Sequence, residues 1–301
     1  MQYPCNQIDL ERRFNSNEAC LGYLVLLRWP NGFVCPSCQK SEFWKLSRHR
    51  FYCRNCKTET TATVGTVFEK SHLPLPLWFR AIWAVVSQKH GMSALGLQKA
   101  LGLGSYRTAW MLLHKIRLSM VSPNRELLKG PLELDETMVG GRHAGRISRW
   151  KDKCIVLIAA EKDGKKVGRI RAQFIPGIHT EHILKALKNM VQPGVTLETD
   201  GCQSYRPLVK EGYQHKRTVT DVSLGEIELL PRVHLVASHL KRWLLGIHHG
   251  RISQKHLQAY LNEFVFRFNR RTSRSRGLLF QRVLENAVQI QHSTYKAIIK
   301  K

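Results

Sequence analysis

The chain has 301 residues, 43% of them hydrophobic, which is enough for one sizeable core and one or two small satellite domains. Lys and Arg number 48 against 22 Asp and Glu, and the formal net charge of +26 calls for a polyanionic partner. The longest apolar run near the start, around Leu24–Leu27, is too short to span a bilayer, and no basic segment followed by an apolar one indicates export. Because basic residues are spread along the whole chain, nucleic acid is the expected partner and a membrane is not.

In chain order, residues 1–30 are predicted to form a helical lead-in, and residues 31–68 show no helical period. This second segment contains two close cysteine pairs, Cys35-Pro-Ser-Cys38 and Cys53-Arg-Asn-Cys56. Each C-x2-C turn directs two thiolates at one ion, so two such turns supply the four ligands of a tetrahedral zinc site. The gap of fourteen residues is one short of the usual range. We predict a structural Zn²⁺ site in a zinc ribbon; redox-active pairs are the alternative.

Residues 69–122 are predicted to be helical. Apolar residues recur at spacings of three and four from Trp78 onward, and Gly102-Leu-Gly104 separates two short helices, as in a helix-turn-helix. The second of these helices begins at Tyr106. We expect Arg107 and Lys115 to reach DNA phosphates; a small helical bundle with a solvated basic face is the alternative.

From about residue 125 the pattern is typical of an α/β domain, which we predict to extend to residue 290. Strands are expected at 132–139, 154–160, 167–175 and 195–199, with a hairpin at Asp163-Gly164 and a helix over 182–191 capped by Thr180. The tail from Val233 onward is predicted to be helical.

Acidic residues are few, so those at strand ends are informative. Glu133, Asp135 and Thr137 share one face of the first α/β strand, and Asp200 ends a later strand. Aspartates on two neighbouring strands are what a two-metal phosphoryl-transfer site requires. Ordinary strand-end or turn aspartates are the alternative.

Several short motifs, in order along nearly the whole chain, resemble the zinc-ribbon insertion-sequence transposases, which have a DDE-type catalytic domain of ribonuclease-H-like fold. The matching stretches are RWPNGFVCPSC (28–38), VGTVF (64–68), YRTAW (106–110), HKIR (114–117), LDETMVGG (134–141), TDG (199–201) followed by SY (204–205), LKRW (240–243), and YLNEF (260–264) followed by FNRR (268–271).

The resemblance implies an α/β ribonuclease-H-like domain preceded by a zinc ribbon and a helix-turn-helix-like segment. It implies a DNA transposase that binds the terminal repeats of an element and the target as double-stranded DNA. Metal-assisted hydrolysis frees a 3′-OH that attacks the target strand, with Mg²⁺ or Mn²⁺ as the catalytic ion. Asp135 and Asp200 match the first two catalytic aspartates of the family. A homo-oligomer on DNA, in the cytoplasm and at the nucleoid of a bacterium or archaeon, is expected.

The chain departs from the family at the third metal ligand, which is usually Glu and in some subgroups Asn, with Lys or Arg seven residues later. Seven residues before Lys241 stands His234. At roughly 100° per residue, His234 and Lys241 lie within about 20° of each other on a helix, whereas His239 falls on the opposite flank. We therefore predict His234 as the third ligand and Lys241 as a phosphate contact, and expect a preference for Mn²⁺ because imidazole suits it better than Mg²⁺.

Two other functions remain open at this stage. A transposase-derived repressor would bind DNA through the zinc ribbon without cleaving it, and His234 would then mark an inactive copy. A structure-specific nuclease of the same fold would cleave without strand transfer. Glu226 and Glu228 are substitute ligands that miss the spacing to Lys241.

Overall fold

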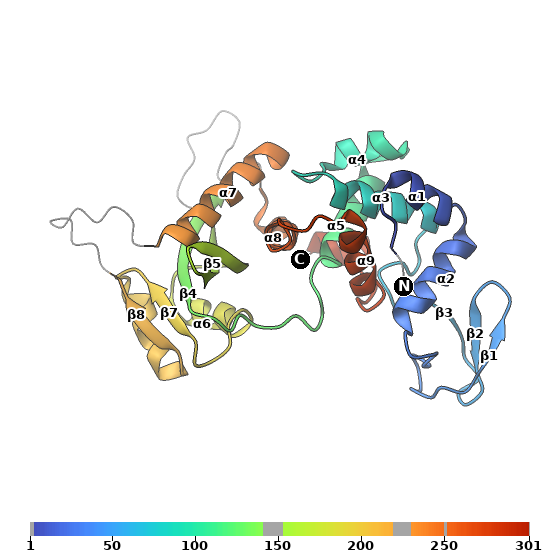
Figure 1. Cartoon of the computed structure of the whole chain (residues 1–301), viewed down its shortest axis with the longest axis horizontal. Coiled ribbons are helices and arrows are strands. Elements are labelled where there is room, and N and C mark those ends of the chain that lie inside the picture. Colours follow the sequence, from blue (N-terminus) through green and yellow to red (C-terminus); the bar gives the residue numbers. More distant parts are fainter. Residues whose placement is uncertain (1–2, 141–152, 219–229, 250–251, 301) are drawn as a thin grey trace. The chain divides into compact units, whose positions relative to one another are not determined.

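The structure, a computed structural model, describes residues 3–140, 153–218, 230–249 and 252–300 of the chain (Figure 1). Two compact units are formed: one by the residues up to Asn124 together with those from Ser273 onward, the other by Arg125–Thr272. Glu226 and Glu228 lie outside the described residues. None of the described helices is long and apolar enough to cross a membrane.

The first unit combines helices with a small sheet. Its helices are α1 (Gln7–Arg13), α2 (Asn17–Arg28), α3 (Leu75–Ser87), α4 (Ala94–Leu101), α5 (Tyr106–Leu118), α9 (Arg276–Ala287) and α10 (Tyr295–Lys300), and its antiparallel strands are β1 (Phe43–Leu46), β2 (Arg50–Cys53) and β3 (Glu59–Thr61).

Helix α9 belongs to this first unit, although the sequence predicted that the α/β domain runs to residue 290. The ring of Phe280 lies 5.5 Å from that of Phe79 and 5.9 Å from that of Trp83, both on α3. Phe280 is fully buried. The predicted end of the α/β domain is therefore corrected to Thr272, because the apolar face of α9 is buried against α3 and not against the larger sheet.

Helices α4 and α5 have the predicted helix-turn-helix layout. The Ser93 hydroxyl accepts a hydrogen bond from the amide of Gly96 at the start of α4, and Gly102 ends that helix with a φ of 62°, a conformation that favours glycine. The basic face of α5 differs from the prediction. Lys115 is only 8% exposed and Arg117 only 2%, so Lys115 does not lie on an open helix face.

The second unit is built on a five-stranded mixed sheet. Its strands are β4 (Leu132–Gly140), β5 (Lys153–Asp163), β6 (Lys166–Ile175), β7 (Thr196–Thr199) and β8 (Gln214–Arg217), in the order β6-β5-β4-β7-β8. Strands β4, β5 and β6 are antiparallel, and β7 and β8 run parallel to β4. The prediction of the first four α/β strands is confirmed, while β8 was not predicted.

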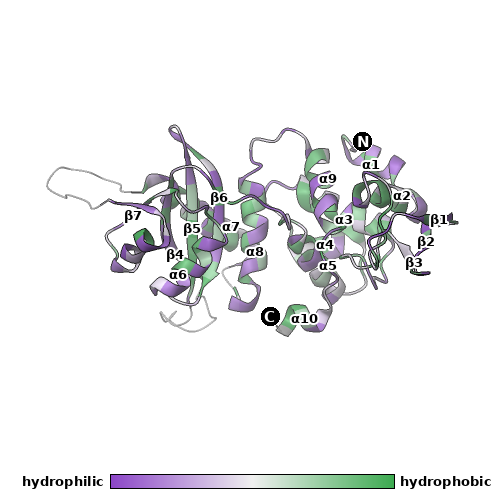
Figure 2. Cartoon of the chain, turned by 90° about the horizontal axis from the view of Figure 1, so that it is seen from below, coloured by the Kyte–Doolittle hydropathy of each residue, from purple (hydrophilic) through white to green (hydrophobic). Residues whose placement is uncertain are grey.

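Helices cover both faces of this sheet (Figures 1 and 2). Helices α7 (Pro231–His248) and α8 (Gln254–Phe268) pack on one face, over the alternate residues Val156, Ile158 and Ala160 of β5. Helix α6 (Thr180–Lys188) and the 3-10 helix η2 (Gln203–Glu211) pack on the other, where Leu132 and Leu134 of β4 are buried. The period of two along β4 therefore directs Glu133 and Asp135 toward α7.

The cap of α6 differs from the prediction by one residue. His179 is the N-cap, with no side-chain cap bond, and Thr180 is the first residue of the helix. The Thr180 hydroxyl instead donates a hydrogen bond of 3.1 Å to the carbonyl oxygen of Ser204 in η2. Thr180 thus ties α6 to the segment that follows β7.

Candidate functional site

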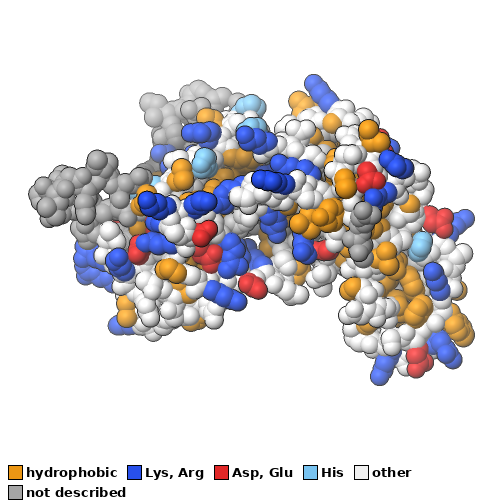
Figure 3. Space-filling view, viewed as in Figure 1, with side chains coloured by type: hydrophobic (Ala, Val, Ile, Leu, Met, Phe, Trp, Pro, Cys, Tyr) orange, Lys and Arg blue, Asp and Glu red, His pale blue; other side chains and the backbone are white. Residues whose placement is uncertain are grey.

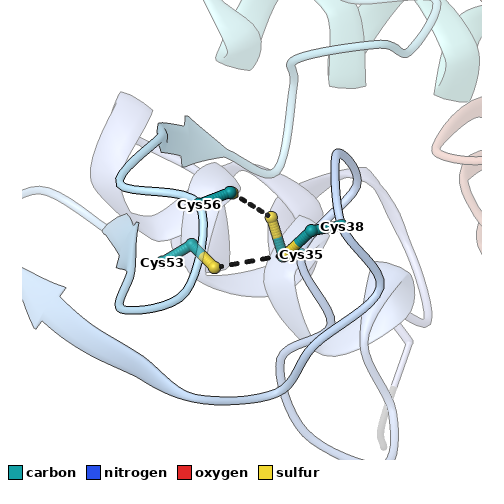
Figure 4. A group of neighbouring side chains, drawn as sticks. All are labelled: Cys35, Cys38, Cys53 and Cys56. Carbon is teal, nitrogen blue, oxygen red and sulfur yellow. Dashed lines mark hydrogen bonds between the residues drawn. The ribbon is translucent and has the colours of Figure 1, made fainter.

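The four paired cysteines converge in the first unit, as their spacing predicts (Figure 4). All four Sγ atoms lie within 4.8 Å of one another, and Sγ–Sγ distances are 3.5 Å for Cys35–Cys56 and for Cys38–Cys53. Four sulfurs about 2.3 Å from one tetrahedral ion would be about 3.8 Å apart. The cluster therefore fits Zn²⁺.

The two cysteine turns have the same backbone geometry. In each, the residue after the second cysteine has a φ of 60°, Gln39 in the first turn and Lys57 in the second. The amide of each of these residues donates to the carbonyl oxygen of the first cysteine of its turn, at 2.9 and 3.0 Å. The Thr58 hydroxyl lies 2.6 Å from the sulfur of Cys56, and this contact lowers the pKa of that thiol to about 6. A lowered pKa favours the thiolate that binds metal.

The second site lies at the carboxyl ends of β4 and β7. The two strands are parallel neighbours, with Glu133 opposite Glu198. Two residues further along the same register, Asp135 stands beside Asp200, the residue that directly follows β7. Adjacent strands are separated by about 4.8 Å, so both carboxylates lie at one edge of the sheet. The structure thus brings together the two aspartates that the sequence singled out.

Helix α7 brings His234 to this edge. Its Nε2 lies 3.3 Å from Oδ2 of Asp135. Lys241 is exposed two turns further along α7. His239 is on another side of the helix, with its ring 6.4 Å from that of Phe268 in α8. The apolar stripe predicted for α7 is also observed, since Val233, Leu240 and Leu244 are buried.

Asp200 lies outside the close contact between Asp135 and His234. Its Oδ1 accepts a hydrogen bond of 3.0 Å from the amide of Cys202, in the turn after β7. Within the described residues, the four cysteines are the only group of three or more candidate ligands whose atoms all lie within 4.8 Å. Asp135, Asp200 and His234 therefore do not form a closed ligand set.

Burial and charge act together on Asp135. Burial and the nearby Glu136 and Asp200 raise its pKa, the amide of Glu136 and the ring of His234 oppose the rise, and the net effect is a pKa raised to about 6. A buried carboxyl group among other carboxyl groups is stabilised by a cation. The electrostatics at this edge of the sheet therefore favour a divalent ion.

Glu133 fixes the start of α7. Its carboxylate is 1% exposed and accepts hydrogen bonds from the amides of Arg232 at 2.7 Å and Val233 at 3.0 Å. The N-cap residue Leu230 makes no side-chain cap bond, so Glu133 caps the helix from a neighbouring strand. The guanidinium of Arg232 also donates to Glu133 at 2.8 Å and to the carbonyl oxygen of Gly164 at 2.6 Å.

Glu136 makes the corresponding contact on the opposite face of β4, where it accepts a hydrogen bond from the hydroxyl of Tyr205 in η2. Tyr205 is fully buried, and this burial raises the pKa of its hydroxyl. The contact holds η2, and with it the turn that contains Asp200, against β4. The sequence patterns predicted no role for Glu133, Glu136 or Tyr205. The sequence feature that could have indicated these roles is the presence of three acidic residues within Glu133–Glu136, in a chain that has few acidic residues.

Two family models match stretches of the chain that contain the two sites. Residues 127–269 match the family model described as an ISXO2-like transposase domain. Residues 15–59 match the model described as a transposase zinc-ribbon domain, which includes α2 as well as most of the predicted ribbon.

A relative is found in Halobacterium salinarum. Over 281 residues, or 85% of this chain and 92% of the relative, the sequence is 26% identical to the uncharacterized protein in transposable element ISH50. By its two matched domains, in their predicted order, the chain belongs to the zinc-ribbon insertion-sequence transposases with a DDE-type, ISXO2-like transposase domain.

Proposed function

We propose that the protein is a DNA transposase that binds the ends of an insertion sequence and catalyses metal-dependent strand cleavage and strand transfer. Asp135, Asp200 and His234 would hold the ions, and Lys241 would contact a phosphate near the scissile bond. The observation that carries the proposal is the 3.3 Å contact between His234 and Asp135, beside Asp200 at the ends of two parallel strands.

The residues at this edge suit divalent ions. Neighbouring ligands of an octahedral ion with bonds of about 2.1 Å are about 3 Å apart, close to the separation of Asp135 Oδ2 and His234 Nε2. When bound, such ions activate the attacking oxygen and stabilise the leaving one. His234 brings no negative charge, so we propose that Mn²⁺ is favoured over Mg²⁺.

We further propose that the transposase domain has a ribonuclease-H-like fold. Support comes from the mixed sheet with helices on both faces and from the two aspartates at neighbouring strand ends. The helix that carries His234 packs on the face toward which Asp135 points, so one face of the sheet holds the whole candidate site.

DNA is the proposed partner of both units, as terminal repeats and as target. The net charge of +26 supports this, and Lys and Arg side chains outnumber acidic ones on the face of the molecule seen in Figure 3. We propose that the zinc ribbon and the helices α4 and α5 recognise the ends. We also propose that the protein acts on DNA as a homo-oligomer, in the cytoplasm.

The test is a strand cleavage and joining assay on DNA that carries the ends of the element. Purified protein is compared with Asp135→Asn and Asp200→Asn variants in Mg²⁺ and in Mn²⁺. Because each aspartate is proposed to hold metal, we expect either substitution to lower both activities by at least about 10³-fold, a loss of about 4 kcal/mol of transition-state stabilisation.

Three outcomes separate the candidate functions. Cleavage and joining that disappear in both variants support the transposase. Specific DNA binding without metal-dependent cleavage by the unchanged protein would contradict the proposed catalysis and favour a transposase-derived repressor. Cleavage without joining would instead favour a nuclease.

A further inference from the structure

A cavity lies in the first unit, and no cysteine of the zinc ribbon lines it. It has a volume of about 450 Å³, within the range of small-ligand sites, and we call it the α5 pocket. Its walls come from the loop around Lys70, from the start and middle of α5, and from the segment that leads into α10. Figure 2 shows α10 near α5, and Arg107 of α5 lies with its guanidinium carbon 3.7 Å from the centre of the Tyr295 ring.

The α5 pocket is cationic. Lys70, Arg107 and Lys115 line it, and the lining includes no Asp or Glu. Lys70 and Arg107 are exposed, whereas Lys115 is 8% exposed. The positive charges therefore extend from the surface into the interior, which favours an anionic ligand.

Lys115 is the unusual member of this set. Burial lowers its pKa, and its ammonium donates to the carbonyl oxygen of Val67 at 3.3 Å. No carboxylate of the described residues lies within ion-pair distance of it. An ammonium has three protons to donate, so two are left for an acceptor that enters the pocket.

The rest of the lining combines apolar and aromatic residues with polar ones, and the polar residues are Ser71, His72, Thr108, His292, Ser293 and Thr294. Trp78 is 2% exposed, with its indole N–H donated to the Ser71 hydroxyl at 2.8 Å, and its ring 5.8 Å from the ammonium of Lys115. Met111 and Leu112 of α5 complete this apolar part. A ligand that combines negative charge with a partly apolar body and hydrogen-bond acceptors would match this lining.

A nucleotide has these properties. Its phosphate suits the exposed cations, and its base can stack on aromatic and Arg side chains while its edge accepts from a buried donor. An acidic peptide would supply the charge but no ring system that carries hydrogen-bond acceptors. Tyr106, which stands beside Arg107 at the start of α5, is 54% exposed in the segment proposed to meet DNA.

We propose that the α5 pocket holds a single nucleotide extruded from the DNA strand that the first unit binds. Lys70 and Arg107 contact its phosphate, and Lys115 donates to the edge of its base. The inference rests on the proposed DNA binding. It gives this unit a means to distinguish distorted or unpaired DNA from a regular duplex, since an unpaired nucleotide is extruded at a lower free-energy cost.

The test compares the full chain, with zinc, on two DNA duplexes that differ by one unpaired nucleotide, with affinity measured by fluorescence anisotropy. We expect the unpaired nucleotide to tighten binding by at least about fivefold, the factor that corresponds to the weaker base–aromatic stacking contributions. Lys115→Met should bring the ratio of the affinities for the two duplexes close to one. It should leave the affinity for the fully paired duplex within about twofold, because Lys115 is too buried to touch a regular duplex.

The matched control is Lys99→Met, which removes an exposed lysine of α4 outside the pocket and should leave the ratio unchanged. Thermal unfolding shows whether Lys115→Met folds. We expect it to fold, because the substitution replaces a buried charge that has no ion-pair partner among the described residues by an apolar side chain. If it does not fold, Arg107→Gln at the exposed mouth should reduce the ratio in the same way.

The outcomes distinguish the inference from the function on which it rests. Failure to bind either duplex would refute the proposed DNA binding itself. Binding of both duplexes with equal affinity, or a ratio that persists in Lys115→Met and Arg107→Gln, would refute the α5 pocket as a nucleotide site. A third outcome is an affinity ratio of one together with thermal stabilisation by free dAMP but not by deoxyadenosine or inorganic phosphate. This outcome would assign the pocket to a free nucleotide and would refute the proposal that it holds a nucleotide extruded from a strand.

Discussion

At the scale of single residues, the proposed chemistry of the transposase domain rests on His234 and Asp135. An imidazole at 3.3 Å from a half-buried carboxylate can share a metal with it, but it contributes no negative charge. Without metal, proximity to His234 lowers the pKa of Asp135, while burial and the neighbouring carboxylates raise it to about 6. We therefore expect the site to hold a hard cation less strongly than a site with three carboxylates does.

Replacement of His234 by Glu tests this difference. The added carboxylate oxygen suits Mg²⁺ better than imidazole does, so His234→Glu should raise strand cleavage at limiting Mg²⁺ by about tenfold relative to cleavage in Mn²⁺. His239→Glu, on the side of α7 that faces Phe268, is the matched control and should leave the ratio unchanged. An unchanged metal preference in His234→Glu would mean that this side chain does not hold the ion.

At the scale of elements, the position of α7 depends on hydrogen bonds from its first turn to an acceptor outside the helix. Glu133 of β4 accepts from two amides of its first turn and pairs with Arg232, which also contacts Gly164 in the β5–β6 turn. A strand, a helix and a hairpin thus meet at one buried carboxylate. This junction sets His234, two residues after Arg232, against Asp135, two residues after Glu133.

Glu133→Ala should therefore destabilise the protein. It leaves two helix amides and the guanidinium of Arg232 without this acceptor, and loss of one partner of a buried ion pair costs about 3–5 kcal/mol. Glu133→Gln, which keeps an acceptor for the amides, should lose less. Denaturant unfolding measures both.

A double-mutant cycle separates the junction from a general packing defect. Arg232→Ala should have a smaller effect in the Glu133→Ala background than in the unchanged protein, because the pair is already broken. Additive effects of the two substitutions would show that Glu133 and Arg232 act independently, contrary to the proposed junction.

At the scale of the molecule, the transposase unit and the zinc ribbon within the first unit are stabilised in different ways. The transposase unit has buried apolar clusters on both faces of its sheet. The zinc ribbon has a small core of Phe33, Cys35, Phe51 and Cys53, in which the rings of Phe33 and Phe51 are 4.9 Å apart. A core of that size depends on the metal.

Removal of zinc by a chelator should consequently affect one region alone. Hydrogen exchange, followed by mass spectrometry, should rise over β1 to β3 and remain unchanged over β4 to β7. Cys38→Ser should reproduce the effect without chelator, while Cys202→Ser, outside the cluster, should not. Unchanged exchange in the ribbon after chelation would contradict a structural role for the metal.

The sequence by itself determined the features that depend on local spacing. Two C-x2-C turns specify the cysteine cluster, a period of 3.6 specifies the buried stripe of α7, and a period of two places Glu133 and Asp135 on one face of β4. Only the tertiary structure decided which of these residues and elements contact one another. Glu133 and the amide of Arg232 are 99 residues apart, α9 joins the first unit across the whole transposase domain, and Lys115 is buried by segments far from α5. Such contacts depend on how apolar faces of distant elements pack, and a pattern within one element carries no information about its partner.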